Sequence, residues 1–399
     1  MTLVEEVFNS FLNKQSIFEN KEALTISYTP ENIPHREEQI KNVAKILAPI
    51  LRGEKASNLF IFGKTGTGKT LVITHVCKKL EEIAKRRGLK VKVIYINCKM
   101  RKVADTEYRL IAQILKEFGV EVPPTGLPTD EVYRIFFEVV KEFEGQIVLV
   151  LDEIDFLVKK SGDEVLYNLT RMNQNLKTKI NIVGISNDVK FMEGLDPRVR
   201  SSLSEEEIVF PPYDAMQLMD ILAERAKVAF REGVVGSEVI AKCAAYAARE
   251  HGDARRALDL LRVAGEIAER EGRDKILEED VDKAQEKIER ESIEEVVRTL
   301  PQQSKAVLLS ALLLLQTREQ PVYTGEVYDV YKGIAVQLGV KPLTQRRVSD
   351  LIAELDMLGL INAKVISKGR YGRTREIYLS LSPDHTMKIE SMLKSELGV

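Results

Sequence analysis

The chain has 399 residues, of which 44% are hydrophobic and 30% are charged, and its formal net charge is -2 at pH 7. These values predict a globular protein of two or three domains, and they exclude a disordered chain and a surface that is basic throughout. The cysteines, Cys77, Cys98 and Cys243, lack the number and spacing of a disulfide framework or a zinc site, so we expect a reducing, intracellular setting.

The hydropathy pattern does not favour a membrane protein. Residues 1–20 have mixed charge and lack the basic-then-apolar layout of a signal peptide. The most apolar stretch, 307–315, is far shorter than the ~20 residues of a membrane helix, and we expect it to be a core helix. We therefore expect a cytoplasmic protein without a membrane partner. The absence of Trp and the many Lys, Arg and Glu residues resemble the composition of thermophile proteins.

Strand-like and helix-like segments alternate from about residue 58 to residue 210. We expect strands at 59–62, 91–96, 147–151, 180–185 and 207–210, and helices at 70–86, 106–118 and 129–143. Such alternation predicts an α/β domain with a doubly wound parallel sheet. Pro211 and Pro212 end it, because proline neither donates to a sheet nor continues a helix. We assign residues 1–212 to this domain.

A glycine-rich loop follows the first expected strand. Residues 63–70 read Gly-Lys-Thr-Gly-Thr-Gly-Lys-Thr, a complete G-x-x-x-x-G-K-T pattern. In this pattern backbone N–H groups converge on phosphate oxygens, Lys69 adds a positive charge, and the Thr70 hydroxyl can ligate Mg²⁺. We expect ATP or ADP to bind, with Mg²⁺, to Gly63, Lys64, Thr65, Gly66, Thr67, Gly68, Lys69, Thr70 and Leu71.

Polar residues at the ends of two later strands complete the expected site. Asp152 follows five apolar residues and is placed where open α/β sheets bind ligands, so we assign it to the Mg²⁺ shell, directly or through water. Glu153 is the candidate for polarising the attacking water. Asn187 ends the strand 180–185, and two interpretations remain open for it: a contact to the γ-phosphate and the lytic water, or an ordinary turn residue.

Residues 214–290 have helical periodicity throughout, and we expect a small helical domain over 213–295. Gly252 and Asp253 can end one helix and cap the next, which places Arg255 in a first helical turn. Arg255 then either contacts the γ-phosphate or is a solvated arginine on an amphipathic helix. Spacing alone favours the second interpretation.

The last part, residues 296–399, changes character again. Helices are expected from Pro301, at 325–338 and at 344–358, followed by strands at 361–366 and 376–381 that a basic hairpin joins, which predicts a winged helix. Residues 341–375 contain eight Lys or Arg against three Asp or Glu. The expected DNA contacts are Thr344, Gln345, Arg346, Arg347 and Ser349 on the third helix, and Lys368, Arg370, Tyr371, Arg373 and Arg375 in the wing.

Together these motifs resemble the AAA+ ATPases of the initiator clade. In particular the chain resembles the archaeal replication initiators related to the origin recognition complex and its cell-division-control loader. The resemblance covers nearly the whole chain. Its most specific segments are Pro-His-Arg-Glu at 34–37, the loop at 65–70, Leu-Asp-Pro-Arg-Val-Arg-Ser-Ser-Leu at 195–203, Gly-Asp-Ala-Arg-Arg-Ala at 252–257 and Thr-Gln-Arg-Arg-Val-Ser at 344–349.

The resemblance implies roles that spacing does not give. Asn187 becomes the first sensor and Arg255 the second. Arg198 becomes the arginine finger offered to a neighbouring subunit's nucleotide, with Arg200 as the alternative. The further implied contacts are His35 and Arg36 near the adenine, and Lys99, Arg101 and Lys102 on DNA, from a helical insertion within 98–118.

The implied function is a replication initiator that binds double-stranded origin DNA, uses slow ATP hydrolysis as a switch, and helps to recruit or load the replicative helicase. Its protein partners would be the helicase and a further copy of itself or a paralogous initiator. Two alternatives are a signal-transduction ATPase and a transcription-regulating ATPase with a winged helix. The lack of a repeat of 20 to 50 residues disfavours the first of these.

Overall fold

The computed structural model describes residues 15–100, 104, 106–123, 125–172, 177–203, 205–317, 321–367, 373–381 and 383–399. The chain divides into two compact units, Met1–Val281 and Asp282–Val399. In the described part of the chain, no helix has the length and the apolar character that crossing a membrane requires.

A five-stranded parallel sheet forms the centre of the first unit. Its strands are β1 (Asn58–Gly63), β2 (Val91–Asn97), β3 (Gln146–Asp152), β4 (Lys179–Ser186) and β5 (Glu205–Phe210), in the order β2-β3-β4-β1-β5. All the pairings are parallel, which confirms the α/β expectation. The carboxyl ends of β1, β3 and β4 therefore share one edge of the sheet, where ligands bind in such folds.

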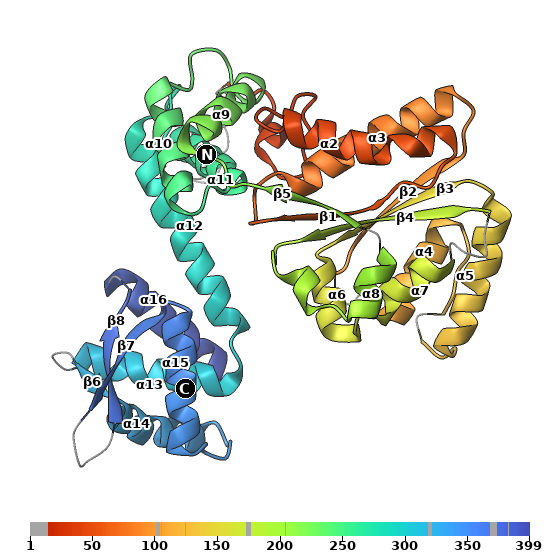
Figure 1. Cartoon of the computed structure of the whole chain (residues 1–399). Helices are drawn as coiled ribbons and strands as arrows, with labels where there is room; N and C mark the ends of the chain where they lie inside the picture. The colour runs from red at the N-terminus through yellow and green to blue at the C-terminus, as the bar shows by residue number, and fades with distance from the viewer. Residues whose placement is uncertain are drawn as a thin grey trace, which may run out of the picture. The chain divides into compact units, whose positions relative to one another are not determined.

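Helices cover both faces of the sheet (Figure 1). On one face lie α2 (Glu37–Leu47) and α3 (Lys69–Arg86), and on the other lie α4 (Glu107–Glu117), α5 (Thr129–Phe143), α6 (Ile154–Ser161), α7 (Glu164–Met172) and α8 (Pro197–Leu203). Strand side chains alternate between the two layers: Leu149 and Leu151 pack with the second group, and Val148 and Val150 with the first. This double burial explains the unbroken apolar runs in the sequence.

Three lid helices follow β5: α9 (Ala215–Ala229), α10 (Ser237–Arg249) and α11 (Ala254–Arg270). The N-terminal residues 15–24, which end in the 3-10 helix η1 (Lys21–Leu24), lie against this lid. The Phe18 and Phe230 ring centroids are 4.7 Å apart, and Arg231 N donates to the Ile17 carbonyl at 3.1 Å. Two further 3-10 helices are η2 (Ala48–Arg52) and η3 (Phe191–Gly194).

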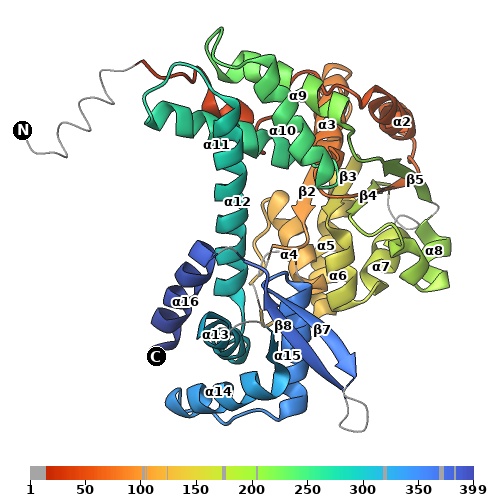
Figure 2. The ribbon, with the colours of Figure 1, turned by 90° about the vertical axis from the view of Figure 1, so that its left-hand side faces the viewer.

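The second unit is a winged helix, as expected (Figure 2). After α12 (Glu278–Thr299), which begins in the first unit, it contains α13 (Gln302–Thr317), β6 (Val322–Tyr323), α14 (Thr324–Gln337), α15 (Gln345–Met357), β7 (Ile361–Ser367), β8 (Arg373–Leu379) and α16 (Pro383–Leu397). The antiparallel sheet has the order β6-β8-β7. The apolar run 307–315 lies in α13 and is largely buried, together with Val348, Leu351, Ile352 and Leu355 of α15.

Candidate nucleotide site and DNA-binding surface

The loop between β1 and α3 has a backbone that only glycine adopts without strain. The φ angles of Gly66 and Gly68 are +72° and +86°. A Cβ atom at Gly66 would lie 1.7 Å from the Asp253 carboxylate, so this glycine also allows a close approach by the lid. The loop thus brings the N-terminus of α3, which begins at Lys69, to the sheet edge where phosphate would bind.

Lys69 is the most connected side chain of this loop. Its Nζ donates to the carbonyls of Gly63 and Lys64 and to Oδ1 of Asn187, each at 2.8 Å. Burial lowers the pKa of the ammonium group to about 8, with Asp152 acting in the opposite direction and Arg255 in the same direction. Asn187, at the end of β4, is therefore held at the phosphate loop.

Asp152 and Thr70 are adjacent, as a shared Mg²⁺ ion would require. Oδ2 of Asp152 accepts hydrogen bonds from the Thr70 hydroxyl at 2.8 Å and from the Tyr95 hydroxyl at 2.5 Å. Among the described residues, no group of three or more His, Cys, Asp or Glu side chains could hold a metal ion. The pair fits Mg²⁺ bound jointly with nucleotide phosphates, because Mg²⁺ commonly uses one or two protein oxygens and completes its shell with phosphate and water.

Glu153 follows directly on Asp152 and has a left-handed backbone, with φ at +54°. Its carboxylate forms an ion pair with Lys99, the Nζ–Oε2 distance being 3.5 Å. Lys99, an expected DNA contact, thus lies beside the expected catalytic glutamate. Arg101 and Lys102 lie outside the described residues.

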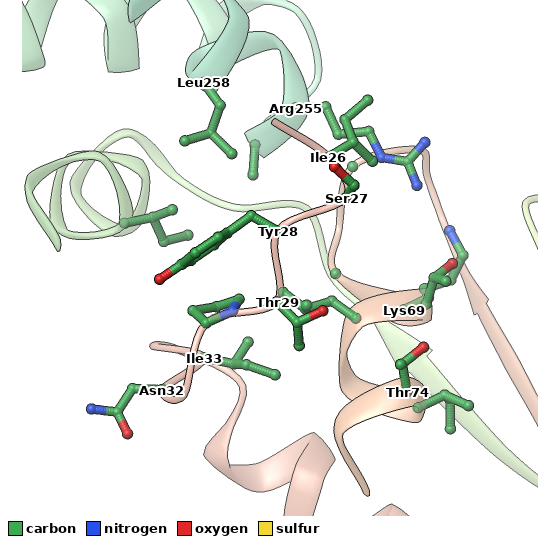
Figure 3. Close-up of a pocket in the computed structure, with 18 of the residues that line it drawn as sticks. Ile26, Ser27, Tyr28, Thr29, Asn32, Ile33, Lys69, Thr74, Arg255 and Leu258 are labelled. Carbon is green, nitrogen blue, oxygen red and sulfur yellow. The ribbon is translucent and has the colours of Figure 1, made fainter. Parts of the chain in front are cut away.

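A cavity of about 900 Å³ adjoins the phosphate loop. Its walls come from residues 25–34, from loop and α3 residues including Gly66–Leu71, and from the lid helices α9 and α11. Figure 3 shows Lys69 and Arg255 in one part of the cavity and Tyr28, Ile33 and Leu258 in another. A cationic part beside an apolar part suits a nucleotide, which joins a polyphosphate to a flat base.

The lid reaches the phosphate loop through the first turn of α11. Asp253 caps this helix, accepting a hydrogen bond from Arg255 N at 2.8 Å, and Ala254 N donates to the Gly66 carbonyl at 3.2 Å. Arg255 lines the cavity. The structure therefore brings Lys69, Thr70, Asp152, Asn187 and Arg255 to one site.

Several of the expected nucleotide contacts do not line the cavity. Lys64 and Thr65 are exposed. His35 and Arg36 are not among the residues that line the cavity. The Nε2 atom of His35 lies 2.9 Å from Oδ2 of Asp220, and Arg36 is buried against backbone carbonyls.

Arg198 and Arg200 both face outward. The side chain of Arg198 is 84% exposed and pairs with Asp196, its Nε lying 3.1 Å from Oδ1. The side chain of Arg200 is 51% exposed and lies 3.7 Å from Glu205. An arginine finger acts on a neighbouring subunit, so exposure is what that role requires, and both residues have it.

The winged helix presents polar side chains at the start of α15. Thr344 caps the helix by accepting a hydrogen bond from Arg347 N at 3.4 Å, while Gln345 and Arg346 are exposed and Ser349 is half-buried. The Arg347 guanidinium lies 3.6 Å from Glu354. The expected wing residues Lys368, Arg370 and Tyr371 lie outside the described residues, as does the side chain of Arg373, whereas Arg375 is half-buried in β8.

Three domain families match the chain. They are an AAA domain at residues 52–186, a Cdc6 AAA+ ATPase-type lid domain at 219–286 and the CDC6 C-terminal winged helix domain at 295–389. The chain is 58% identical over 385 residues to the ORC1-type DNA replication protein of Thermococcus onnurineus, covering 95% of this chain and 92% of that protein. The chain belongs to the family of ORC1-type DNA replication proteins.

Other members of this ORC1-type family agree with the assignment. The Pyrococcus abyssi protein is 57% identical over an alignment of 401 positions, which covers 99% of this chain and 94% of that protein. The solved structure of the Aeropyrum pernix ORC1 protein in complex with DNA has 48% sequence identity and a TM-score of 0.84, covering 95% of this chain and 98% of that chain. The expected initiator resemblance is thus confirmed: this ORC1-type chain has the AAA+ ATPase fold of replication initiators, with a winged helix, and family membership implies nucleotide binding.

Sequence reasoning missed several residues of the site in this ORC1-type protein. Tyr95 lies in the middle of an expected strand and reaches Asp152 only through the pairing of β2 with β3. Asp253 was expected only as a helix cap, but its carboxylate also lies against Gly66. Residues 25–33 carry no motif, although they line much of the cavity.

Proposed function

We propose that this protein binds double-stranded origin DNA under the control of ATP and ADP, and that it helps to recruit or load the replicative helicase. The supporting observation is that one chain combines the cavity containing Lys69 and Arg255 with a winged helix, and that a relative 48% identical was solved in complex with DNA. The proposed parts are an AAA+ domain at 1–212, a lid at 213–295 and a DNA-binding winged helix at 296–399. A second copy or a paralogous initiator is the proposed assembly partner.

The nucleotide acts as a switch in this proposal. Lys69 and the loop N–H groups bind the phosphates, Thr70 and Asp152 hold Mg²⁺, and Glu153 polarises the attacking water. Mg²⁺, when bound there, would supply positive charge against the phosphate oxygens. Arg255 stands on the lid, so it favours a closed lid only while a γ-phosphate is present. The ion pair of Glu153 with Lys99 supports slow turnover, because it occupies the carboxylate that would accept the proton.

The DNA contacts divide into two kinds. Arg346, exposed near the N-terminus of α15, is the proposed reader of a base edge, for which arginine on guanine is best suited. The wing around Arg373 contacts phosphates and positions the protein without reading sequence. Arg346→Ala should then relax sequence preference at a cost of ~1 to 3 kcal/mol, whereas Arg373→Ala should weaken all duplexes alike and reduce the salt dependence.

The deciding experiment is genome-wide recovery of DNA crosslinked to the protein in its own cells. The wild type is compared with an Arg346→Ala, Arg373→Ala double variant, and with Lys332→Ala as a matched control for loss of basic charge. Lys332 lies on α14 and pairs with Asp329 at 2.9 Å. We expect one or a few sharp peaks at a replication start, retained in the control and lost in the double variant. Many promoter peaks, or none, would contradict the initiator function.

A further inference from the structure

Arg36 is a fully buried arginine whose guanidinium bonds to backbone. Its residue is 1% exposed. The Nε atom donates to the Thr67 carbonyl at 2.9 Å, Nη1 to the His35 carbonyl at 2.8 Å and Nη2 to the Pro211 carbonyl at 2.6 Å. The guanidinium carbon lies 3.7 Å from the Tyr213 ring centroid. All three nitrogens of the planar fork are thus used, which a lysine ammonium could not reproduce.

Two of the three carbonyls, those of Thr67 and Pro211, belong to segments with different tasks. Thr67 lies between Gly66 and Gly68 in the phosphate loop, and Pro211 begins the connection from β5 to the lid. Tyr213 continues this connection: its N donates to the Gly252 carbonyl at 3.3 Å, and a Cβ atom on Gly68 would lie 2.8 Å from its hydroxyl. One guanidinium therefore fastens the phosphate loop to the hinge of the lid.

We propose that Arg36 is a positioning residue for the phosphate loop and not a contact to adenine. The physical reason is the planar trans peptide, in which the C=O and the next N–H point in opposite directions. Arg36 does not line the cavity. Because its hydrogen bond holds the Thr67 carbonyl toward Arg36, the Gly68 N–H of the same peptide points away from Arg36. The loop then needs little rearrangement when phosphate binds, and the affinity for phosphate rises accordingly. This inference rests on the proposed nucleotide function.

The surroundings of the Arg36 guanidinium satisfy its buried charge. A buried charge is costly unless hydrogen bonds satisfy it, and here carbonyls and an aromatic face do so. Burial lowers the pKa of Arg36, yet a guanidinium remains charged in any ordinary buffer. Its loss would leave the Thr67 and Pro211 carbonyls without this donor, and the loop would be free to turn the Gly68 N–H elsewhere.

The test compares ADP with adenosine as ligands of the full-length protein. We expect Arg36→Gln to weaken ADP binding at least tenfold and to leave the weak binding of adenosine unchanged, because only ADP uses the loop N–H groups. Arg36→Lys should give an intermediate loss for ADP. An equal loss for both ligands would identify a base contact and overturn the proposal, and so would unchanged binding of both.

Arg273→Gln is the matched control. Arg273 also uses several donors, with Nη1 and Nη2 bonding to Asp280 at 2.6 and 2.5 Å, but it lies in the lid away from the phosphate loop. It should lower the melting temperature without changing the ratio of the ADP and adenosine affinities. If Arg36→Gln does not fold, Tyr213→Leu removes the stacking face and should shift the ratio in the same direction. A wild type that binds neither ADP nor ATP would refute the nucleotide function itself, whereas normal ADP binding by every variant would refute only the role of Arg36.

Discussion

At the scale of single residues, Lys69 makes nucleotide binding depend on pH. Burial lowers the pKa of Lys69 to about 8, and a bound phosphate would raise it. Above about pH 8 the Lys69 side chain of the nucleotide-free protein has lost its proton, so nucleotide binding takes up a proton. The affinity for ADP should then be constant below this pH and fall by up to about tenfold per pH unit above it. Calorimetric titrations from about pH 7.5 to 9.5 measure the effect, since the phosphate, with a second pKa of ~6, is ionised throughout.

The matched variant for this prediction is Lys69→Arg. A guanidinium stays protonated over the whole range, so any residual ADP binding should not vary with pH. Lys69→Ala should lose nucleotide binding at every pH and keep its circular dichroism spectrum. A wild type whose affinity is as independent of pH as that of Lys69→Arg would show that Lys69 does not titrate near pH 8.

The residue scale also shows what the sequence could predict. Lys69, Thr70 and Asp152 were placed correctly relative to one another, because a fixed loop spacing and the ends of parallel strands determine where they lie. Arg255 required a family resemblance, since spacing alone favoured a solvated arginine. Tyr95 had no signal at all, because its hydroxyl reaches Asp152 only through a strand pairing distant in sequence.

At the scale of elements, the connection between β5 and the lid depends on Gly252. Its φ is +69°, and a Cβ atom there would lie 2.2 Å from the Tyr213 carbonyl oxygen. Gly88 is a natural control, with φ at +70° and no atom within 4 Å of such a Cβ. We expect Gly88→Ala to lower the free energy of unfolding by about 1 kcal/mol and Gly252→Ala by about 3 kcal/mol. Denaturant unfolding measures both, and equal costs would mean that the hinge backbone moves freely aside.

Several long helices were predicted well, whereas α2, α16 and the short helices of the sheet domain were not. The helix expected at 129–143 is α5 (Thr129–Phe143), and the helix expected at 344–358 is α15 (Gln345–Met357). Helices α6, α7 and α8 were missed because two turns give too few repeats of the pattern. Strand β8 begins at Arg373 and ends at Leu379, earlier than the expected 376–381, because its pairing with β7 extends through the basic residues Arg373 and Arg375.

At the scale of the whole molecule, the hydrophobic cores of the sheet domain and the winged helix are separate clusters that lie in different compact units. We expect two transitions in scanning calorimetry. ADP at 100 times its dissociation constant should stabilise only the transition of the first unit, by about 2.7 kcal/mol. Lys69→Ala should abolish this shift. A single transition, or two transitions that ADP shifts equally, would show that the two units unfold together.

The N-terminal segment ties the pocket to the lid mechanically. Residues 15–24 lie against the lid, where Arg225 donates to the Ala23 carbonyl at 3.1 Å and Lys21 lies 2.8 Å from Glu266. Residues 25–34 then wall the cavity, and the chain continues into α2 on the sheet. Because residues 25–34 are held at the lid on one side and at α2 on the other, their path must change when the lid moves relative to the sheet. Tilting the lid would therefore move residues 25–34, so we expect the shape of the nucleotide pocket to depend on the angle of the lid.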